Sequence, residues 1–205
     1  MAPVKIYGIP KSRAVRVIWA AEELQTPYEI VPVTMADKAH KQPAYTSVNP
    51  NARLPAIDDN GFRMSESLGI NMYLAKKAGK LYPKTIEGEA QCWQWSLWTV
   101  FEIDKQVNDW AAHDHVLPEA QRDPAKLKAA LEVLSVPFGV LEGVLGKQQY
   151  LVTPDAFSIA DLNVASALYR CINMDFGANK NLARWYKACW ERPAAKKARQ
   201  MRESS

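Results

Sequence analysis

Hydrophobic and polar positions follow two different patterns in this chain, and the change falls near residue 80. Before it, short apolar runs alternate with helical stretches, which predicts strands and helices in turn. The apolar runs are VKIYG (4–8), YEIVPV (28–33), LPAID (54–58) and FRM (62–64). They predict a β-α-β unit followed by a hairpin and by a helix that begins near Glu66.

A helix is predicted between the first two strands, from Ser12 to Leu24. Its apolar side chains form one stripe of Val17, Ala21 and Leu24, with Val15 and Ile18 beside it. Because a crossover helix joins parallel strands, the first two strands are expected to be parallel. Asn60-Gly61 favours a tight turn with positive φ angles, so the last two strands should be antiparallel neighbours. The sheet is therefore predicted to be mixed.

The second part of the chain is predicted to be helical throughout. Two glycines and a proline in GKLYPKTIEG (79–88) indicate the end of a helix and a linker. The helical stretches that follow are 87–115, 126–145 and 158–174, and then a stripe of Leu182, Trp185, Tyr186 and Cys189 that ends before Pro193. Within the first of them, the stripe of Trp93, Leu97 and Val100 is expected to face the core. We expect domains at 1–80 and 88–205, joined by a linker at 81–87.

Composition favours a soluble globular protein, since 48% of the residues are hydrophobic and 23% are charged. The formal charge of +4 comes largely from a basic run near the C-terminus without interleaved aromatic residues. That run is interpreted as the solvated face of a last helix, so no nucleic-acid partner is expected. The sequence shows neither an export signal nor a run of about 20 apolar residues, so no membrane partner is expected and a cytoplasmic location is predicted.

Cysteine and histidine spacing gives no sign of a metal site. The three cysteines, Cys92, Cys171 and Cys189, are widely spaced without a CxxC motif, which predicts neither a disulfide framework nor a zinc site. His113 and His115 are two residues apart and would point to different sides of a helix. We therefore expect a chain that works without a metal in a reducing compartment.

Ser158 and Asp161 have the spacing of a capping box at the start of a predicted helix. Phe157 and Leu162 flank the pair as an apolar staple. We assign Asp161 a role in stability and not in catalysis.

Three further segments have residue types suited to ligand binding. Pro55 stands at the start of a strand, where a cis bond would leave the backbone N–H and C=O of Leu54 free to pair with an extended peptide; a trans edge proline is the alternative. Glu66 and Ser67 open a helix whose N-terminus could hold a carboxylate, with Glu66 beside it for an ammonium group; simple helix caps are the alternative. Ser12 precedes the first helix, as an N-cap or as a hydrogen-bond donor to a thiolate.

Taken in order, these segments resemble the cytosolic glutathione transferase family over nearly the whole chain. The resemblance is carried by Tyr7-Gly8, Ser12-Arg13, Asn49-Pro50, Leu54-Pro55-Ala56-Ile57, Glu66-Ser67 and Ser158-Ile159-Ala160-Asp161. The opening MAPVKIYG and His40-Lys41 before Pro43 are similar to the phi class and its bacterial and fungal relatives. The fold implied is a thioredoxin-like α/β domain with a mixed sheet, followed by an all-α domain.

The resemblance also implies a site for glutathione as co-substrate. Ser12 would stabilise its thiolate, with Tyr7 as the rival donor, because other classes use a tyrosine at the end of the first strand. Pro55 would be cis, and Leu54 would pair with the cysteinyl backbone. The γ-glutamyl end would lie at Glu66 and Ser67, and the glycyl carboxylate would lie near His40, Lys41 and Arg53.

The second substrate would be a small, mostly apolar electrophile. Trp98, Glu102 and Gln106 recur at a spacing of four residues and are the candidates for its site. A homodimer is expected by resemblance, in which Glu102 or Asp104 could supply a carboxylate to the partner.

The function predicted from this resemblance is a glutathione S-transferase. A glutathione-dependent isomerase or dehalogenase would use the same thiolate. A non-catalytic glutathione-binding or scaffolding module is the alternative from a different class.

Overall fold

The computed structural model describes residues 2–205, which form two compact units. The first unit contains residues 2–82 together with Glu191–Ser205, and the second contains Pro83–Trp190. The domain boundaries expected from the sequence stay a prediction.

The first unit is built on a four-stranded sheet with the order β2-β1-β3-β4. Its strands are β1 (Val4–Tyr7), β2 (Tyr28–Val31), β3 (Ala56–Asp59) and β4 (Phe62–Ser65). β1 pairs parallel with β2 and antiparallel with β3, while β3 and β4 are antiparallel. Asn60 and Gly61 turn the last hairpin with φ angles of 55° and 93°. The predicted mixed sheet and Asn-Gly turn are confirmed.

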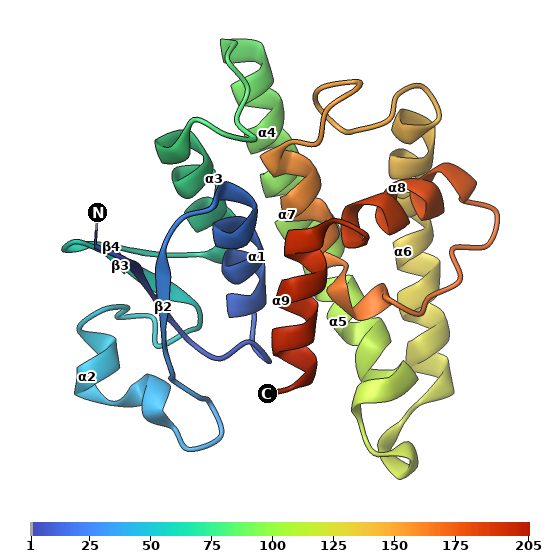
Figure 1. Cartoon of the computed structure of the whole chain (residues 1–205). Helices are drawn as coiled ribbons and strands as arrows, with labels where there is room; N and C mark the ends of the chain where they lie inside the picture. Colours follow the sequence, from blue (N-terminus) through green and yellow to red (C-terminus); the bar gives the residue numbers. More distant parts are fainter. Residues whose placement is uncertain (1) are drawn as a thin grey trace. The chain divides into compact units, whose positions relative to one another are not determined.

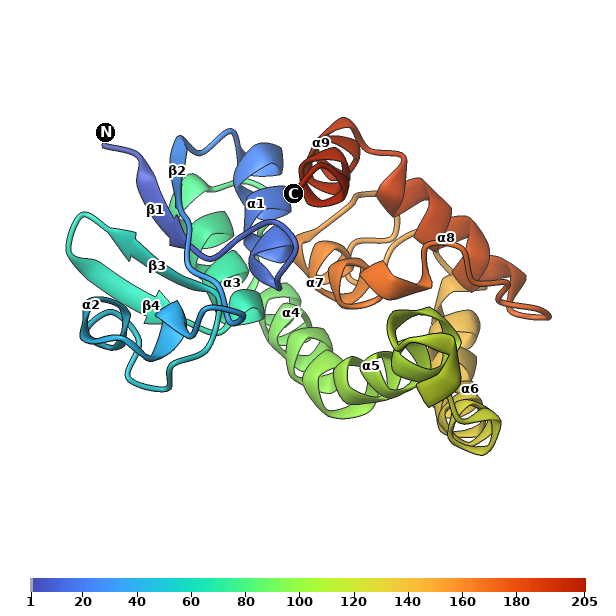
Figure 2. The same cartoon turned by 90° about the horizontal axis from the view of Figure 1, so that it is seen from below.

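Helices α1 (Ala14–Leu24) and α3 (Ser67–Ala78) lie side by side on one face of this sheet (Figures 1 and 2). The predicted apolar stripe of α1 is buried, as are the neighbouring residues from Ala14 to Ala21. α1 begins two residues after Ser12, so Ser12 lies in the turn between β1 and the helix. The first unit thus has the α/β architecture of a thioredoxin-like domain.

Three further helical segments complete the first unit. A 3₁₀ turn at Ala39–Lys41 and the short α2 (Pro43–Thr46) connect β2 with β3. α9 (Pro193–Glu203), at the end of the chain, packs along α1. In both views α9 runs beside α1 (Figures 1 and 2).

The second unit is all-helical, as predicted. Its helices are α4 (Ile86–Trp98), α5 (Lys105–Ala111), α6 (Pro124–Leu145), α7 (Ile159–Ala167) and α8 (Lys180–Trp190). Two π-helical segments, Thr99–Asp104 and Ala112–Val116, extend α4 and α5 into one long helix. Short 3₁₀ turns occupy Glu119–Gln121 and Tyr169–Cys171.

The predicted core stripe of the long helix is wrong. Trp93 is 42% exposed and Leu97 is 55% exposed, and Val100 is exposed as well. The buried face is formed instead by Cys92, Trp95, Ser96, Thr99, Ile103 and Val107. Large apolar residues occur on both faces of this helix, so the periodicity alone could not show which face is buried. The π-helical segment also changes the number of residues per turn, which shifts any extrapolated stripe.

The capping box of α7 is confirmed and lies at the centre of the second unit. Asp161 Oδ2 accepts hydrogen bonds from the Ser158 N–H at 2.9 Å and the Ser158 hydroxyl at 2.7 Å. Oδ1 accepts from the Leu151 N–H and the Trp185 indole, each at 2.9 Å. One buried carboxylate therefore joins three segments of this unit.

Within residues 2–205, none of the helices combines the length and the apolar character that crossing a membrane requires.

Candidate functional site

Ser12 lies in the turn that follows β1, with its hydroxyl at the start of α1. The hydroxyl donates to Ile9 O at 2.7 Å, and its oxygen accepts from the Ala14 N–H at 3.1 Å. The Ser12 N–H also donates to Ile9 O, at 2.9 Å. The oxygen is thus held by a backbone donor, while the hydroxyl proton is turned toward a carbonyl oxygen.

Tyr7, the rival donor, has its ring in an apolar cluster. The cluster consists of the buried residues Val33, Tyr45 and Ala56, with Tyr7 and Leu54 packed against them. The Tyr7 and Tyr45 rings are 6.0 Å apart between centroids. This packing gives the Tyr7 ring a structural role at the end of β1.

The Leu54–Pro55 peptide bond is cis, as the family resemblance implies. Leu54 immediately precedes β3, and its backbone N–H and C=O make no hydrogen bond with any residue in the range 2–205. Both groups therefore remain available to an extended ligand.

Two residues that sequence reasoning missed hold the loop before Leu54. The Asn49 side-chain amide donates to Arg53 O at 2.7 Å, and the Tyr45 hydroxyl donates to the same carbonyl. Asn49 also accepts from the Asn51 N–H at 3.1 Å. Asn49 is a polar residue that is buried in a loop. Its burial could not be predicted from the local sequence pattern.

The start of α3 presents the second candidate segment. Glu66 is exposed and adopts an unusual backbone conformation with φ 70° and ψ 104°. Ser67 is the first residue of the helix and is buried. The N-cap residue Glu66 makes no side-chain capping hydrogen bond, and the alternative in which the serines serve as helix caps stays open.

His40, Lys41 and Arg53 differ in their surroundings. His40 is buried, and its Nδ1 lies 3.2 Å from Thr34 O. Because a carbonyl oxygen can only accept, Nδ1 carries a proton, and Nε2 can donate only when the ring is charged. Lys41 and Arg53 are exposed. His40 is therefore not a solvated surface residue, whereas Lys41 is.

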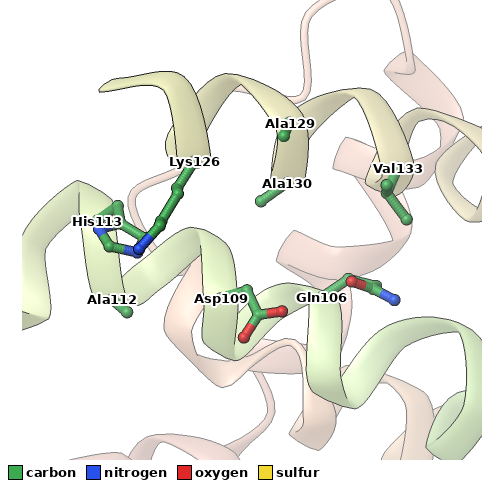
Figure 3. A pocket seen from close by; sticks show the side chains of 8 residues that line it. All are labelled: Gln106, Asp109, Ala112, His113, Lys126, Ala129, Ala130 and Val133. Atoms are coloured by element: carbon green, nitrogen blue, oxygen red, sulfur yellow. The ribbon is translucent and has the colours of Figure 1, made fainter. Parts of the chain in front are cut away.

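The three second-unit candidates differ in burial and in surroundings. Trp98 is half-buried and packs edge-on against Trp95 at 5.1 Å between ring centroids, whereas Glu102 is exposed. Gln106 lines a pocket of about 460 Å³ between α5 and α6, and neither of the other two does. Figure 3 shows Gln106, Asp109 and His113 on one wall of this pocket and Lys126 on the other. The assignment of an electrophile site to these residues stays a prediction.

The histidines near the end of the long helix make hydrogen bonds within the protein. No group of three or more His, Cys, Asp and Glu side chains suited to a metal ion occurs in the described part of the chain. His113 Nδ1 accepts a hydrogen bond from the Asp123 N–H at 3.2 Å, and His115 Nδ1 lies 2.9 Å from Asp114 Oδ2.

Family comparison agrees with this geometry. Residues 2–76 match the domain described as "Glutathione S-transferase, N-terminal domain", and residues 107–193 match "Glutathione S-transferase, C-terminal domain". The chain belongs to the glutathione S-transferase family. The recognition of this family from the sequence is confirmed.

Individual members of the glutathione S-transferase family are similar over the whole length. Glutathione S-transferase 3 of Zea mays is 31% identical, covering 96% of this chain and 93% of its own. The structure of poplar glutathione transferase F1 superposes with a TM-score of 0.90 at 27% identity, with both chains fully covered. Glutathione S-transferase I from maize, solved in complex with an atrazine glutathione conjugate, gives a TM-score of 0.88 at 28% identity, again over both full chains.

Proposed function

We propose that this chain is a glutathione transferase in which Ser12 stabilises the thiolate of bound glutathione. The observation that carries the proposal is the Ser12 hydroxyl in the turn between β1 and α1, with its oxygen held by the Ala14 N–H at the start of the helix. A hydroxyl that already accepts a hydrogen bond is a stronger donor. The N-terminal end of α1 adds a partial positive charge at the same place.

The chemistry begins with loss of the thiol proton to solvent. A free thiol has a pKa of about 8.5, so only a few per cent is ionised at pH 7. Lowering that pKa by about two units corresponds to roughly 2.7 kcal/mol and raises the thiolate fraction about 25-fold. One hydrogen bond to a charged acceptor contributes about 1.5–3 kcal/mol, which is enough for most of this change.

Ser12 supplies that bond when its hydroxyl proton turns from Ile9 O to the sulfur. The thiolate then attacks an electrophilic carbon, and a sulfur–carbon bond forms. The leaving group departs with the electron pair of the bond that breaks. In an addition reaction no group leaves, and the adjacent atom takes a proton from solvent instead.

The remaining first-unit residues are proposed to bind glutathione. Leu54 offers its unpaired backbone N–H and C=O to the cysteinyl residue. Ser67, at the start of α3, would bind the γ-glutamyl carboxylate, and the Glu66 carboxylate would bind the ammonium group.

The glycyl carboxylate is proposed to lie near His40, Lys41 and Arg53. A charged His40 ring would donate from Nε2 while Nδ1 keeps its bond to Thr34 O.

Several features rest on the family resemblance. We propose domains at 1–80 and 88–205, the second contributing a site for an apolar electrophile with Trp98, Glu102 and Gln106. We further propose a homodimer that acts in the cytoplasm.

A non-catalytic glutathione-binding module is the second candidate. It is favoured by one observation, namely that both hydrogen-bonding functions of the Ser12 hydroxyl are used within the protein. A serine that serves only as a helix cap would look the same.

A titration of the thiolate absorbance of bound glutathione separates the two candidates. In the wild-type protein the bound thiol should titrate well below about 8.5. Ser12→Ala should raise its pKa by about one to two units and lower turnover at pH 7 about 3- to 25-fold, with glutathione affinity nearly unchanged. Ser135→Ala is the matched control, because that exposed hydroxyl contacts only Glu132 O of its own helix. Equal turnover of Ser12→Ala and wild type would rule out the assigned role.

A further inference from the structure

The C-terminal helix contacts the turn that carries Ser12. Arg202, near the end of α9, donates from Nη1 to Pro10 O at 3.2 Å and also to Lys11 O. Lys11 Nζ in turn donates to Ser205 O at 3.0 Å. Residues separated by more than 190 positions in the sequence thus meet at the peptide units next to Ser12.

Arg202 donates hydrogen bonds to two carbonyl groups of the turn that accept none from the backbone of the described residues. In this turn, backbone N–H groups donate hydrogen bonds to Ile9 O and Ser12 O. Within residues 2–205, no backbone N–H donates to Pro10 O or Lys11 O. The guanidinium group therefore fixes the orientation of both carbonyls, and the second belongs to the peptide bond that joins Lys11 to Ser12.

The position of Arg202 is itself fixed, because α9 is held along α1 by ion pairs. Arg192 binds both carboxylate oxygens of Glu23 at 2.7 and 2.8 Å, and the Glu23 side chain is only 8% exposed. Lys197 Nζ lies 2.8 Å from Glu22 Oε1. The two helices run antiparallel, since Arg192 meets the end of α1 and Arg202 meets the turn before its start.

Small side chains allow the close approach of these helices. Ala195 and Ala198 are fully buried, and Arg202 follows Ala198 by four residues on the same face. The guanidinium is thereby placed over the turn before α1, although the sequence suggested only a solvated basic face.

We propose that Arg202 is a positioning residue for the thiolate-stabilising hydroxyl of Ser12. This inference rests on the proposed function. By holding the carbonyls of Pro10 and Lys11, Arg202 fixes the peptide that carries Ser12, and with it the position of the Ser12 hydroxyl oxygen. Only the hydroxyl proton then has to turn from Ile9 O to the sulfur, so little reorganisation opposes stabilisation of the thiolate.

The test is the pKa of the thiol of bound glutathione in Arg202→Met. We expect a pKa higher by about 0.5–1 unit, which from a wild-type value near 6.5 means about 1.5- to 3-fold less thiolate at pH 7. The value of kcat/KM for conjugation should fall by the same factor, with glutathione affinity nearly unchanged. Arg202→Lys, which keeps a donor and the charge, should recover part of the loss.

Arg199→Met is the matched control. Arg199 lies on the same helix and loses the same charge, but it pairs only with Glu203 at 2.6 Å and its side chain is 43% exposed. It should leave the thiol pKa unchanged. If Arg202→Met does not fold, Arg202→Gln replaces it with the same expectation, since glutamine favours a helix and cannot reach as far.

A double-variant cycle distinguishes positioning from a direct effect of the charge. In a Ser12→Ala background, Arg202→Met should cause no further rise of the thiol pKa, because the hydroxyl through which Arg202 acts is absent. An equal rise in both backgrounds overturns positioning. An unchanged pKa in Arg202→Met, with a lowered pKa in the wild type, overturns this inference alone. A wild-type thiol that titrates as in water overturns the proposed function as well.

Discussion

Gly8 and Ser12 lie so close together that a Cβ atom on Gly8 would be 3.3 Å from Ser12 Oγ. The same Cβ would lie 3.0 Å from Ala14 Cβ, which is closer than side chains normally pack. Gly8 also has a φ of 137°, a conformation that L-residues with a side chain rarely adopt. A side chain at residue 8 would therefore crowd both Ala14 and the Ser12 hydroxyl.

Gly8→Ala should therefore affect both stability and chemistry. We expect a loss of about 1–3 kcal/mol in the free energy of unfolding from the φ angle and the contact with Ala14. The new methyl group should also displace the Ser12 hydroxyl and raise the pKa of the bound glutathione thiol. Urea unfolding and the thiolate titration measure the two effects.

Gly139→Ala is the control for this substitution. Gly139 lies inside α6 with no atom within 4 Å of an added Cβ, so alanine should stabilise by about 0.5–1 kcal/mol. A Gly8→Ala protein as stable and as active as wild type would contradict the steric argument.

Asp161→Asn should cost the second unit about 2–4 kcal/mol of stability, because an amide nitrogen would face donors that now meet a carboxylate oxygen. The Ser158 N–H and hydroxyl both point at Oδ2, and the Leu151 N–H and Trp185 indole point at Oδ1. Whichever way the amide is turned, one pair of buried donors loses its acceptor. Equilibrium unfolding in urea measures the change.

Asp155→Asn provides the comparison at an exposed position just before the same helix. It should change stability by less than about 0.5 kcal/mol. Equal effects of the two substitutions would show that the capping box contributes no more than a surface charge.

The sequence predicted this capping box and the Asn-Gly hairpin because both are local. Ser158 and Asp161 are three residues apart, and Asn60 and Gly61 are adjacent, so their geometry depends on few other contacts. The parallel pairing of the first two strands and the antiparallel pairing of the last two followed in the same way from one crossover helix and one tight turn.

Long-range contacts were not predictable from the same patterns. Arg202 contacts the turn before Ser12 only because α9 packs along α1. Asn49 donates to Arg53 O only because the loop folds so that its side chain is buried next to that carbonyl. The core face of the long helix was misassigned because Trp93 and Leu97 on one face are as apolar as Trp95 and Ile103 on the other. Burial decides these cases, and burial depends on the whole fold.

The three protein thiols should be inert in the native state. Burial raises the pKa of both Cys92 and Cys171 to about 12, and Cys189 is fully buried as well. A disulfide-forming thiol reagent such as 5,5′-dithiobis(2-nitrobenzoic acid) should therefore label none of them at pH 8 within minutes, since the thiolate is the reactive form. In urea all three should react. Rapid labelling of one native thiol would indicate local opening around it.

Asp59 should contribute to the dependence of the first unit's stability on pH in the acid range. Its side chain is 1% exposed; Oδ2 accepts hydrogen bonds from Lys77 Nζ and, at 2.7 Å, from the Tyr73 hydroxyl. Burial by itself raises the pKa of Asp59, but the hydrogen bonds from Lys77 and Tyr73 outweigh it and leave the pKa below its ordinary value of 3.8.

A carboxyl group whose pKa is lowered by folding stabilises the native state at every pH above its unfolded pKa. That contribution is lost as the pH falls below about 3.8 toward the lowered value in the folded protein. Asp59→Asn cannot ionise, so it should be less stable than wild type by about 1–3 kcal/mol at pH 6, and the difference should shrink between pH 4 and pH 3. Urea unfolding of both proteins at pH 6, 4.5, 3.5 and 3 measures it.

Asp109→Asn is the control for a carboxylate in an exposed ion pair. Asp109 pairs with Lys105, and their side chains are 49% and 74% exposed. Its effect should stay below about 0.5 kcal/mol at each pH, because solvent screens the pair. A stability difference between wild type and Asp59→Asn that is the same at pH 6 and pH 3 would show that Asp59 stabilises the fold through packing and not through its charge.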